Sequence, residues 1–206
     1  LSKRDIYGTR LLPDGRKAGI VIETAGESTL ETDVLALVSD HWREIGIPLY
    51  VRTSQRDIFR SRALAGEVLM GVWTGLDNGV PTADMAPTGL ASTAGDQLQW
   101  PVWGMHYITA ETKGQPPDYA PAIDLLRLLR DWQNTTSTAA RATIWADMLA
   151  IRADQVLTIG TVSGALQPVV WSSAMRNVPQ EALYGFEPTS YLGAYLPDTF
   201  YYEGGA

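Results

Sequence analysis

The chain has 206 residues, of which 45% are hydrophobic and 19% charged, so it can bury a globular core. Its formal net charge is -7, and its 16 Lys and Arg residues form no basic run, which argues against a nucleic-acid partner or an anionic membrane surface. The lack of cysteine excludes thiol nucleophiles, disulfides and thiolate metal sites. No stretch has the length of a membrane span. Leu1 is not an initiator residue, and residues 1–4 resemble the interior of a polypeptide. We therefore expect the chain to be a piece of a longer protein.

The first part of the chain alternates predicted strands and helices. An irregular entry segment, residues 1–16, precedes a buried strand over 19–24. Ser28 and Glu31 have the spacing of a capping box, in which Glu31 reaches back to the backbone of Ser28. A second strand is predicted over 47–52. Apolar residues recur on one face of the helix between these strands: Leu30, Val34, Leu37, Val38, Trp42 and Ile45.

A short helix capped by Ser54 and a third strand over 68–73 continue this pattern. The length of the first crossover favours parallel pairing. Periodicity then disappears over 74–118, a stretch rich in Gly, Pro, Thr, Asp and aromatic residues. Such a long excursion between regular elements is often functional.

Two further helices are predicted over 118–133 and 138–155, with the N-cap of the second supplied by the turn that ends at Ser137. Their expected core-facing residues are Ile123, Leu126, Leu129 and Trp132 in the first, and Ile144, Trp145, Met148, Ile151 and Val156 in the second. Closing strands are predicted over 156–162 and 169–171. This alternation predicts an α/β fold with a mixed, largely parallel central sheet flanked by helices.

The search for catalytic residues finds little. His41 lies in an amphipathic helix without a partner, and His106 lies in the aromatic-rich segment, where packing is favoured over ligand contact although contact is possible. The sequence has no metal-ligand spacing, nucleophile elbow, phosphate-binding loop or dinucleotide fingerprint. We therefore expect no enzyme, no metal and no cofactor.

A binding site is the better interpretation of the loop that follows the third strand. Trp73 offers a flat ring, Thr74, Asp77 and Asn78 offer hydrogen bonds, and Gly75 permits close approach of backbone. Ligands collect at the carboxyl ends of strands in open α/β sheets. The alternative is that Trp73 covers the core and the rest is a polar turn.

A second aromatic group comprises Trp100, Trp103 and Tyr107. It either lines a cleft or packs the excursion onto the sheet. We include Trp103 and His106 among the candidate ligand-binding residues.

Several short motifs occur in an order that resembles the family 5 extracellular solute-binding proteins, the dipeptide-, oligopeptide- and nickel-binding subunits of ABC importers. The motifs cover residues 8–16, 42–47, 55–59, 73–75, 133–137, 159–162 and 176–179. The resemblance implies one lobe of a two-lobed, periplasmic-binding-protein-like (type II) fold. Residues 1–176 would form the C-terminal lobe, and residues 177–206 would return to the N-terminal lobe.

The resemblance also implies a function. The protein would capture a small solute, an oligopeptide or similar, in the cleft between two lobes and deliver it to permease subunits. It would act outside the cytoplasm, in the periplasm or its equivalent, as a monomer without inserting into the membrane.

One position departs from the family pattern. In peptide-binding members an aspartate soon after the strand-end tryptophan pairs with the peptide amino group, and by spacing this position is Leu76, with the acid one residue later at Asp77. Either Asp77 serves, or the solute is a sugar- or opine-like compound without that amine.

A non-transport receptor and a hydrolase are the other hypotheses. A solvent-facing Trp73 favours the solute binder, a flat apolar patch the receptor, and a buried carboxylate pair with raised pKa the hydrolase.

Overall fold

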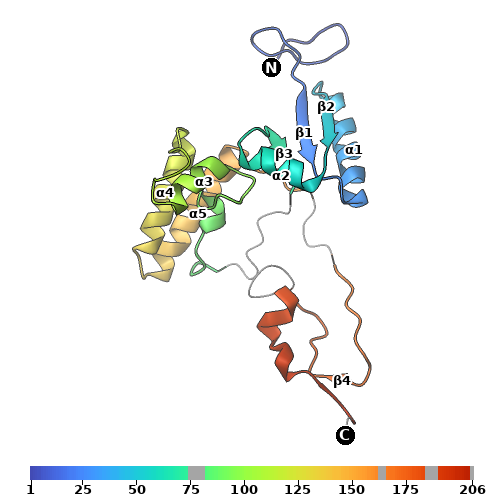
Figure 1. Cartoon of the computed structure of the whole chain (residues 1–206), viewed down its shortest axis with the longest axis vertical. Helices are drawn as coiled ribbons and strands as arrows, with labels where there is room; N and C mark the ends of the chain where they lie inside the picture. The colour runs from blue at the N-terminus through green and yellow to red at the C-terminus, as the bar shows by residue number, and fades with distance from the viewer. Residues whose placement is uncertain (74–81, 162–165, 184–189, 205–206) are drawn as a thin grey trace. The chain divides into compact units, whose positions relative to one another are not determined.

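The computed structural model describes residues 1–73, 82–161, 166–183 and 190–204, and the chain divides into two compact units. The first unit comprises Leu1–Trp73 and Ala91–Leu126, and the second comprises Thr74–Leu90 and Arg127–Ala206. Figure 1 shows the elements of both units.

The first unit contains a three-stranded parallel sheet in the order β2-β1-β3. Its strands are β1 (Ile20–Thr24), β2 (Leu49–Thr53) and β3 (Met70–Gly71). Helix α1 (Thr29–Glu44) connects β1 to β2, and α2 (Arg56–Leu64) connects β2 to β3. The predicted α/β architecture with a parallel sheet flanked by helices is confirmed, although β3 is shorter than predicted and the described sheet is wholly parallel.

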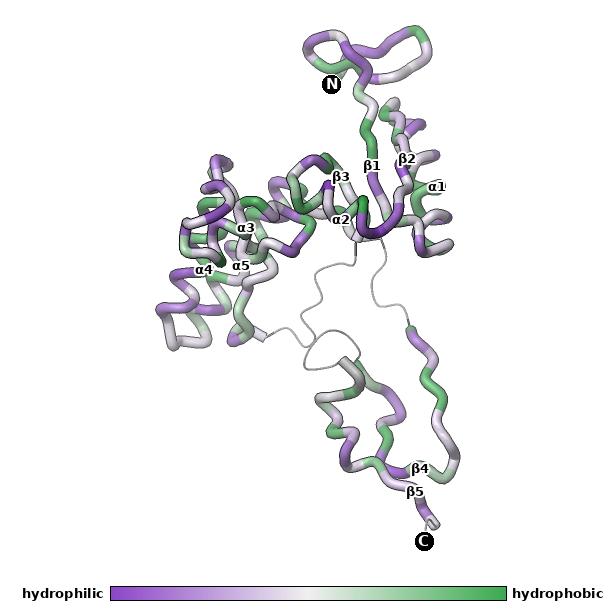
Figure 2. Tube along the Cα trace, viewed as in Figure 1, coloured by the Kyte–Doolittle hydropathy of each residue, from purple (hydrophilic) through white to green (hydrophobic). Residues whose placement is uncertain are grey.

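The two helices cover opposite faces of this sheet. On one face Ile22 and Leu49 form a buried cluster with Leu35 of α1. On the other face the fully buried Phe59 of α2 lies over Gly71, where an added Cβ would come within 3.2 Å of the Phe59 ring. The opposite placement follows because successive side chains of a strand point to opposite faces. Figure 2 shows hydrophobic residues at the start of β1.

Helix α1 begins as predicted but packs through a different stripe. The Ser28 side chain accepts a hydrogen bond from the Glu31 backbone N–H at 3.2 Å, whereas the Glu31 carboxylate bonds to the hydroxyl at the end of β1 rather than closing a capping box. Leu30 and Leu37 are exposed, and Leu35, which the predicted face omitted, is buried. Apolar residues lie on two neighbouring stripes of α1, and only contact with the sheet selects one of them.

Helix α3 (Pro101–Ile108) lies inside the stretch that lacked periodicity. It is short, and a proline at its first position is a helix-start signal that could have located it. A short 3₁₀ turn, η1 (Thr88–Leu90), precedes it.

For α2, the predicted cap Ser54 is wrong by one residue, because the N-cap is Gln55.

The helices α4 (Ala120–Gln133) and α5 (Thr138–Asp154) agree closely with the predicted ranges. Ser137 caps α5 by accepting a hydrogen bond from the Ala140 N–H. Helix α4 crosses from the first unit into the second. The predicted core residues Leu129 and Trp132 are buried, whereas Ile123 is exposed. The buried face also contains Ala122, Leu125 and Leu128.

The predicted closing strands over 156–162 and 169–171 are wrong for the described residues. Residues 156–161 and 169–171 adopt no strand, and Val162 lies outside the described residues. Val156 has a left-handed backbone, and Ile159 and Val170 are exposed. An apolar run becomes a strand only where a sheet edge accepts its hydrogen bonds, and residues 156–161 and 169–171 pair with no described strand.

The end of the chain contains a short antiparallel pair between β4 (Met175–Arg176) and β5 (Tyr201–Tyr202). Two 3₁₀ segments precede β5: η2 (Ser190–Tyr195) and η3 (Pro197–Thr199). An ion pair between Arg176 and Glu203 adds to this pairing. The domain boundary after Arg176, and the return of residues 177–206 to a second lobe, stay predictions.

Candidate functional site

The carboxyl ends of the three parallel strands meet at one edge of the sheet. Thr24 of β1 pairs with Thr53 of β2, and Glu23 pairs with Gly71 of β3. From β1 the chain continues to β2 on one side, while β3 lies on the other side of β1. The boundary between β1 and β3 is therefore a topological switch point, where open α/β sheets bind ligands.

Trp73 follows β3 at this edge. Its ring centroid lies 6.3 Å from that of Phe59, with the two planes tilted by 37°. Trp73 nevertheless keeps 45% of its surface exposed, whereas Phe59 is fully buried. The ring thus packs on the core, but the described residues do not cover it. Such a partly exposed ring fits a contact surface better than a ring that only fills the core.

Two arginines from consecutive turns of α2 lie beside the Trp73 ring. The guanidinium carbon of Arg56 is 5.9 Å from the ring centroid, and that of Arg60 is 5.6 Å away. Residues four apart share one face of a helix, and a cation within about 6 Å of an indole is attracted by its electron-rich face. Trp73 and these two side chains form an aromatic–cationic group at the sheet edge.

Arg56 already has an anionic partner in Glu27. The Nε of Arg56 donates to both carboxylate oxygens of Glu27, at 3.0 and 2.8 Å, and Nη2 also bonds to the carboxylate. Hydrogen bonds from Arg56 lower the pKa of Glu27, and the same carboxylate raises the pKa of Arg56. Arg60 forms no ion pair or side-chain hydrogen bond with any residue that the structure describes.

The loop between β1 and α1 positions Glu27. Gly26 has a φ of +65°, and a Cβ on it would lie 2.0 Å from Cγ2 of Thr53. Its N–H donates to the Thr24 hydroxyl at 3.1 Å, and that hydroxyl in turn donates to Glu31. Only glycine permits so close an approach of this loop to β2, and the approach brings Glu27 within reach of α2.

A buried carboxylate, Glu23, anchors α2 to the sheet. It is 4% exposed and accepts hydrogen bonds from Nε and Nη2 of Arg62, each at 3.1 Å, with Arg52 at 3.5 Å. The hydrogen bonds of Arg62 dominate, and with the charges of Arg62 and Arg52 they lower the pKa of Glu23 despite the opposing effect of burial. A carboxylate kept ionised in this way is suited to holding a helix, not to donating a proton.

The other predicted site residues are divided between α3 and the undescribed loop. Trp103 and His106 are half-buried on α3, and the Trp103 ring lies 5.4 Å from that of Trp100. Among the described residues no ring contact or hydrogen bond joins Trp103 or His106 to Trp73. Their role in binding stays a prediction. Four of the predicted site residues lie outside the described residues: Thr74, Gly75, Asp77 and Asn78.

The arginines beside Trp73 are the feature that sequence reasoning missed. The segment from Arg56 to Arg60 places two arginines at helical spacing around Phe59, directly after a strand. That spacing was available as a signal. Nothing in the sequence, however, said which side chain of the sheet would meet this face of α2.

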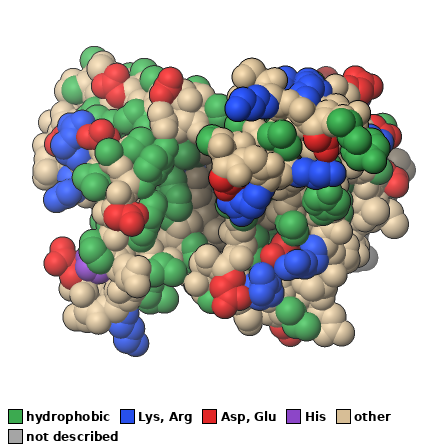
Figure 3. All heavy atoms as spheres, turned by 90° about the horizontal axis from the view of Figure 1, so that it is seen from above, with side chains coloured by type: hydrophobic (Ala, Val, Ile, Leu, Met, Phe, Trp, Pro, Cys, Tyr) green, Lys and Arg blue, Asp and Glu red, His purple; other side chains and the backbone are tan. Residues whose placement is uncertain are grey.

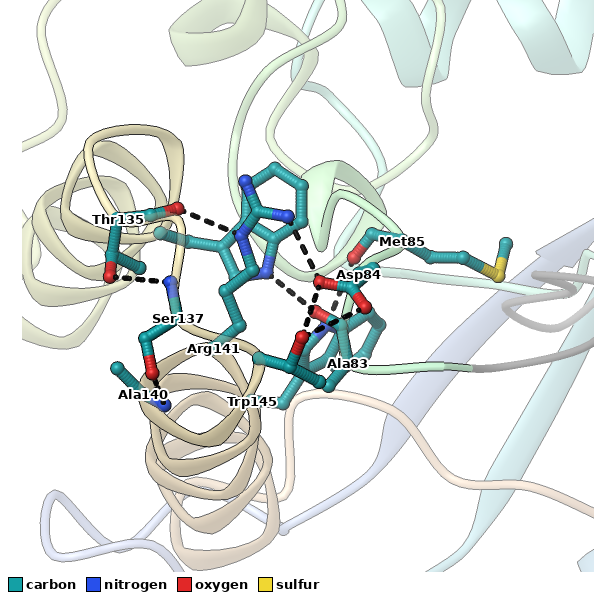
Figure 4. A network of polar contacts seen from close by, with 10 residues as sticks. Ala83, Asp84, Met85, Thr135, Ser137, Ala140, Arg141 and Trp145 are labelled. Atoms are coloured by element: carbon teal, nitrogen blue, oxygen red, sulfur yellow. Dashed lines mark hydrogen bonds and ion pairs between the residues drawn. The ribbon is translucent and has the colours of Figure 1, made fainter.

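A second polar group occupies the second unit and holds the segment after residue 81 against α4 and α5. The indole N–H of Trp132 donates to the Ala83 carbonyl, and that of Trp145 donates to the Met85 carbonyl, both at 2.9 Å. Between them Asp84 forms an ion pair with Arg141 at 3.0 Å. Figure 4 shows this network, which we call the helix clamp.

Beside the helix clamp lies an open pocket of about 310 Å³. It is lined by Thr82, Ala83, Ala142, Trp145, Ala146 and Leu149. Its surface is almost wholly apolar, so it lacks the polar groups that orient a ligand in a specific site.

Three further observations bear on the class of protein. Across residues 1–73, 82–161, 166–183 and 190–204, no group of three or more acidic, His or Cys side chains could hold a metal ion. In the same ranges no helix combines the length and apolarity needed to cross a membrane. On the face displayed in Figure 3, Lys and Arg side chains are interspersed with Asp and Glu.

The fold is that of one lobe of the periplasmic binding proteins. The chain is similar to the oligopeptide-binding protein OppA, with a TM-score of 0.59 and 20% identity over 75% of this chain and 26% of that one. It is also similar to the periplasmic binding protein MelB from Agrobacterium fabrum, in complex with stachyose, with a TM-score of 0.58 and 13% identity over 78% of this chain and 23% of that one.

A third similar structure is NikA from Brucella suis, in complex with Fe(III)-EDTA. Its TM-score is 0.51, at 14% identity over 75% of this chain and 28% of that one. The chain thus spans about a quarter of the length of these three proteins. No protein-family profile and no curated protein matches the chain. At these identities the comparisons establish the fold.

Proposed function

We propose that the protein is the solute-binding component of an ABC importer, and that it captures a small solute, an oligopeptide or similar, between two lobes. The observation that carries the proposal is the exposed ring of Trp73 at the switch point of a parallel sheet. A rigid aromatic surface at this position is what a ligand site in an open α/β fold requires.

The similar structures support this proposal at the level of class. OppA is named for oligopeptide binding, and the MelB and NikA structures hold stachyose and Fe(III)-EDTA. The proposal also includes capture outside the cytoplasm, transfer to permease subunits and action as a monomer. It describes a binding protein rather than an enzyme, and the buried Glu23, whose pKa is lowered by Arg62, gives the hydrolase hypothesis no support.

Native mass spectrometry of the full-length protein, purified gently enough to retain a bound solute, tests this function. A set of adduct masses that fits peptides would support an oligopeptide ligand. A single mass of a sugar- or opine-like compound would support the alternative solute class. Repeated preparations without any adduct, together with no binding across a broad panel of solutes, would contradict the proposal and favour a receptor role.

Two variants connect this test to Trp73. Trp73→Ala removes the exposed ring, and we expect at least about a tenfold loss of affinity for the retained solute, as for the loss of an aromatic anchor. Tyr50→Ala is the matched control, because Tyr50 is also exposed but lies near the start of edge strand β2, away from the carboxyl ends of the strands. Equal losses in both variants would mean that Trp73 has no special role.

A further inference from the structure

Helix α2 carries three arginines, and two of them are already paired with carboxylates. Arg56 is bound by Glu27, and Arg62 is bound by Glu23 and Glu67. Arg60 differs, because it lies over the Trp73 ring and forms no ion pair or side-chain hydrogen bond with a described residue. Asp57, one turn earlier on α2, forms no ion pair with it either.

No described residue uses the hydrogen-bonding capacity of Arg60. A guanidinium has five N–H donors in a plane, and attraction to an indole ring uses its charge rather than these donors. Arg60 is half-buried, so part of its hydration is lost, and no anion among the described residues replaces it. A planar carboxylate, which can accept two parallel N–H bonds, is the partner that best fits such a group.

Glu27 makes the two arginines beside Trp73 unequal. Its carboxylate neutralises Arg56 through several hydrogen bonds, so an incoming anion would have to displace it there. Arg60 requires no displacement of a described residue. Arg60 therefore carries the positive charge of the aromatic–cationic group that no described carboxylate neutralises.

We propose that Arg60 and Trp73 form a subsite for a carboxylate group of the solute. The inference rests on the proposed solute-binding function and narrows it. Solutes with a free carboxylate, such as peptides with an unblocked C-terminus or opines, are selected over neutral sugars. Trp73 contacts the apolar part next to the carboxylate, and Arg60 supplies the charge-assisted hydrogen bonds.

The test uses the full-length protein and two matched peptide libraries. A tripeptide library with free C-terminal carboxylates is compared with the same library carrying C-terminal amides, and octopine is compared with stachyose. Affinity is measured by thermal shift and calorimetry. We expect the free carboxylates to bind at least about tenfold more tightly than the amides, as for hydrogen bonds to charged groups.

Three variants separate recognition from folding. Arg60→Gln should reduce the ratio of carboxylate to amide affinity to about one, while Arg60→Lys should keep part of it because the charge remains. Arg43→Gln, which removes an exposed arginine of α1 paired with Asp40, should leave the ratio unchanged. The ratio is informative because a general loss of structure would weaken both libraries equally.

Two results would overturn the inference while the solute-binding function stands. The first is that Arg60→Gln leaves the ratio of carboxylate to amide affinity unchanged. The second is that the wild type and Arg60→Gln both bind stachyose and that neither binds any probe with a carboxylate. If no probe binds the wild type, the copurified adduct decides: a solute without a carboxylate contradicts this inference alone. If no adduct exists either, the proposed function itself fails.

Discussion

The described residues form arginine–tryptophan contacts at two places in the chain, and these contacts are used differently. In the helix clamp the guanidinium of Arg141 lies 4.3 Å from the ring centroid of Trp132, which is 8% exposed. At the sheet edge Arg60 lies 5.6 Å from Trp73, which is 45% exposed. The attraction between cation and ring is common to both, so the neighbouring groups determine the difference.

In the helix clamp every partner is engaged. Arg141 donates to the Thr135 carbonyl at 2.9 Å and pairs with Asp84, while the Trp132 N–H bonds to Ala83. Such a group stabilises the fold because its polar atoms are satisfied within the protein. The charge of Arg141 is already paired with a carboxylate, and the single N–H of the Trp132 indole is already bonded.

At the sheet edge neither the Arg60 side chain nor the Trp73 indole N–H hydrogen-bonds to a described residue. We therefore expect their contribution to stability to be small, and no described residue takes up their bonding capacity. The comparison shows that a residue pair becomes a structural element or a candidate binding surface according to how many of its polar atoms are already bonded. Three predictions test this distinction.

The largest expected difference is between alanine variants of the two tryptophans. Trp132→Ala should lower the free energy of unfolding by about 3–5 kcal/mol, because it removes a buried ring and an indole hydrogen bond. Trp73→Ala should cost about 1 kcal/mol or less, because half of the ring is exposed. Urea unfolding followed by circular dichroism measures both. Equal losses of unfolding free energy in the two variants would contradict the distinction between a tryptophan that is bonded within the protein and one that is exposed at a candidate binding surface.

The next prediction concerns the ion pair between Arg62 of α2 and the buried Glu23. Glu23→Gln should lower the free energy of unfolding by about 2 kcal/mol near pH 7, because the buried acceptor of Arg62 loses its charge. Unlike Arg60, Arg62 depends on an internal carboxylate, so this variant should destabilise the unit without changing the ratio of carboxylate to amide affinity.

The same variant has a characteristic pH dependence. The pKa of Glu23 is held below its ordinary value of 4.5 by Arg62, so the unfolded chain takes up this proton at a higher pH than the folded protein. The stabilisation is therefore complete above about pH 5 and is lost as the pH falls through the folded pKa. Unfolding measured between pH 7 and pH 3 should show the gap between wild type and Glu23→Gln closing; a constant gap would exclude this ion pair as its cause.

The smallest effects are expected for the two arginines that contact the rings. Arg141→Gln should cost about 1–2 kcal/mol, since it removes a backbone hydrogen bond and the pair with Asp84. Arg60→Gln should change the free energy of unfolding by no more than about 0.5 kcal/mol. A larger cost for Arg60→Gln than for Arg141→Gln would identify Arg60 as a structural residue.

Much of the fold could be predicted because strand and helix signals are local. The parallel unit of β1, α1 and β2, the cap at Ser137 and the ranges of α4 and α5 follow from apolar spacing and capping residues. The closing strands failed because a strand requires a partner edge, which no local pattern contains. Helix α3 was missed because it is short and apolar on most sides, which leaves no helical periodicity to detect.

The sequence was enough to propose Trp73 as part of a site, but not to name its neighbours. Trp73 was proposed because it lies at the end of a predicted strand, and that inference needs only chain order. Arg60 could not be identified in this way, because its meeting with Trp73 depends on the angle at which α2 crosses the sheet. That angle is set by Phe59 over Gly71 and by Arg62 on Glu23, which are contacts between segments distant in sequence.

By itself, then, the sequence determined the class of fold and the order of the main elements, and it placed Trp73 directly after the third strand, because these depend on local periodicity and on the fixed direction of parallel strands. Only the tertiary structure decided which of the Arg–Trp contacts are satisfied internally. Glu27 neutralises Arg56 and Asp84 holds Arg141, while Arg60 is left beside an exposed ring. The physical reason is that satisfaction of a charged group is a property of its neighbours in space, and those neighbours come from other parts of the chain.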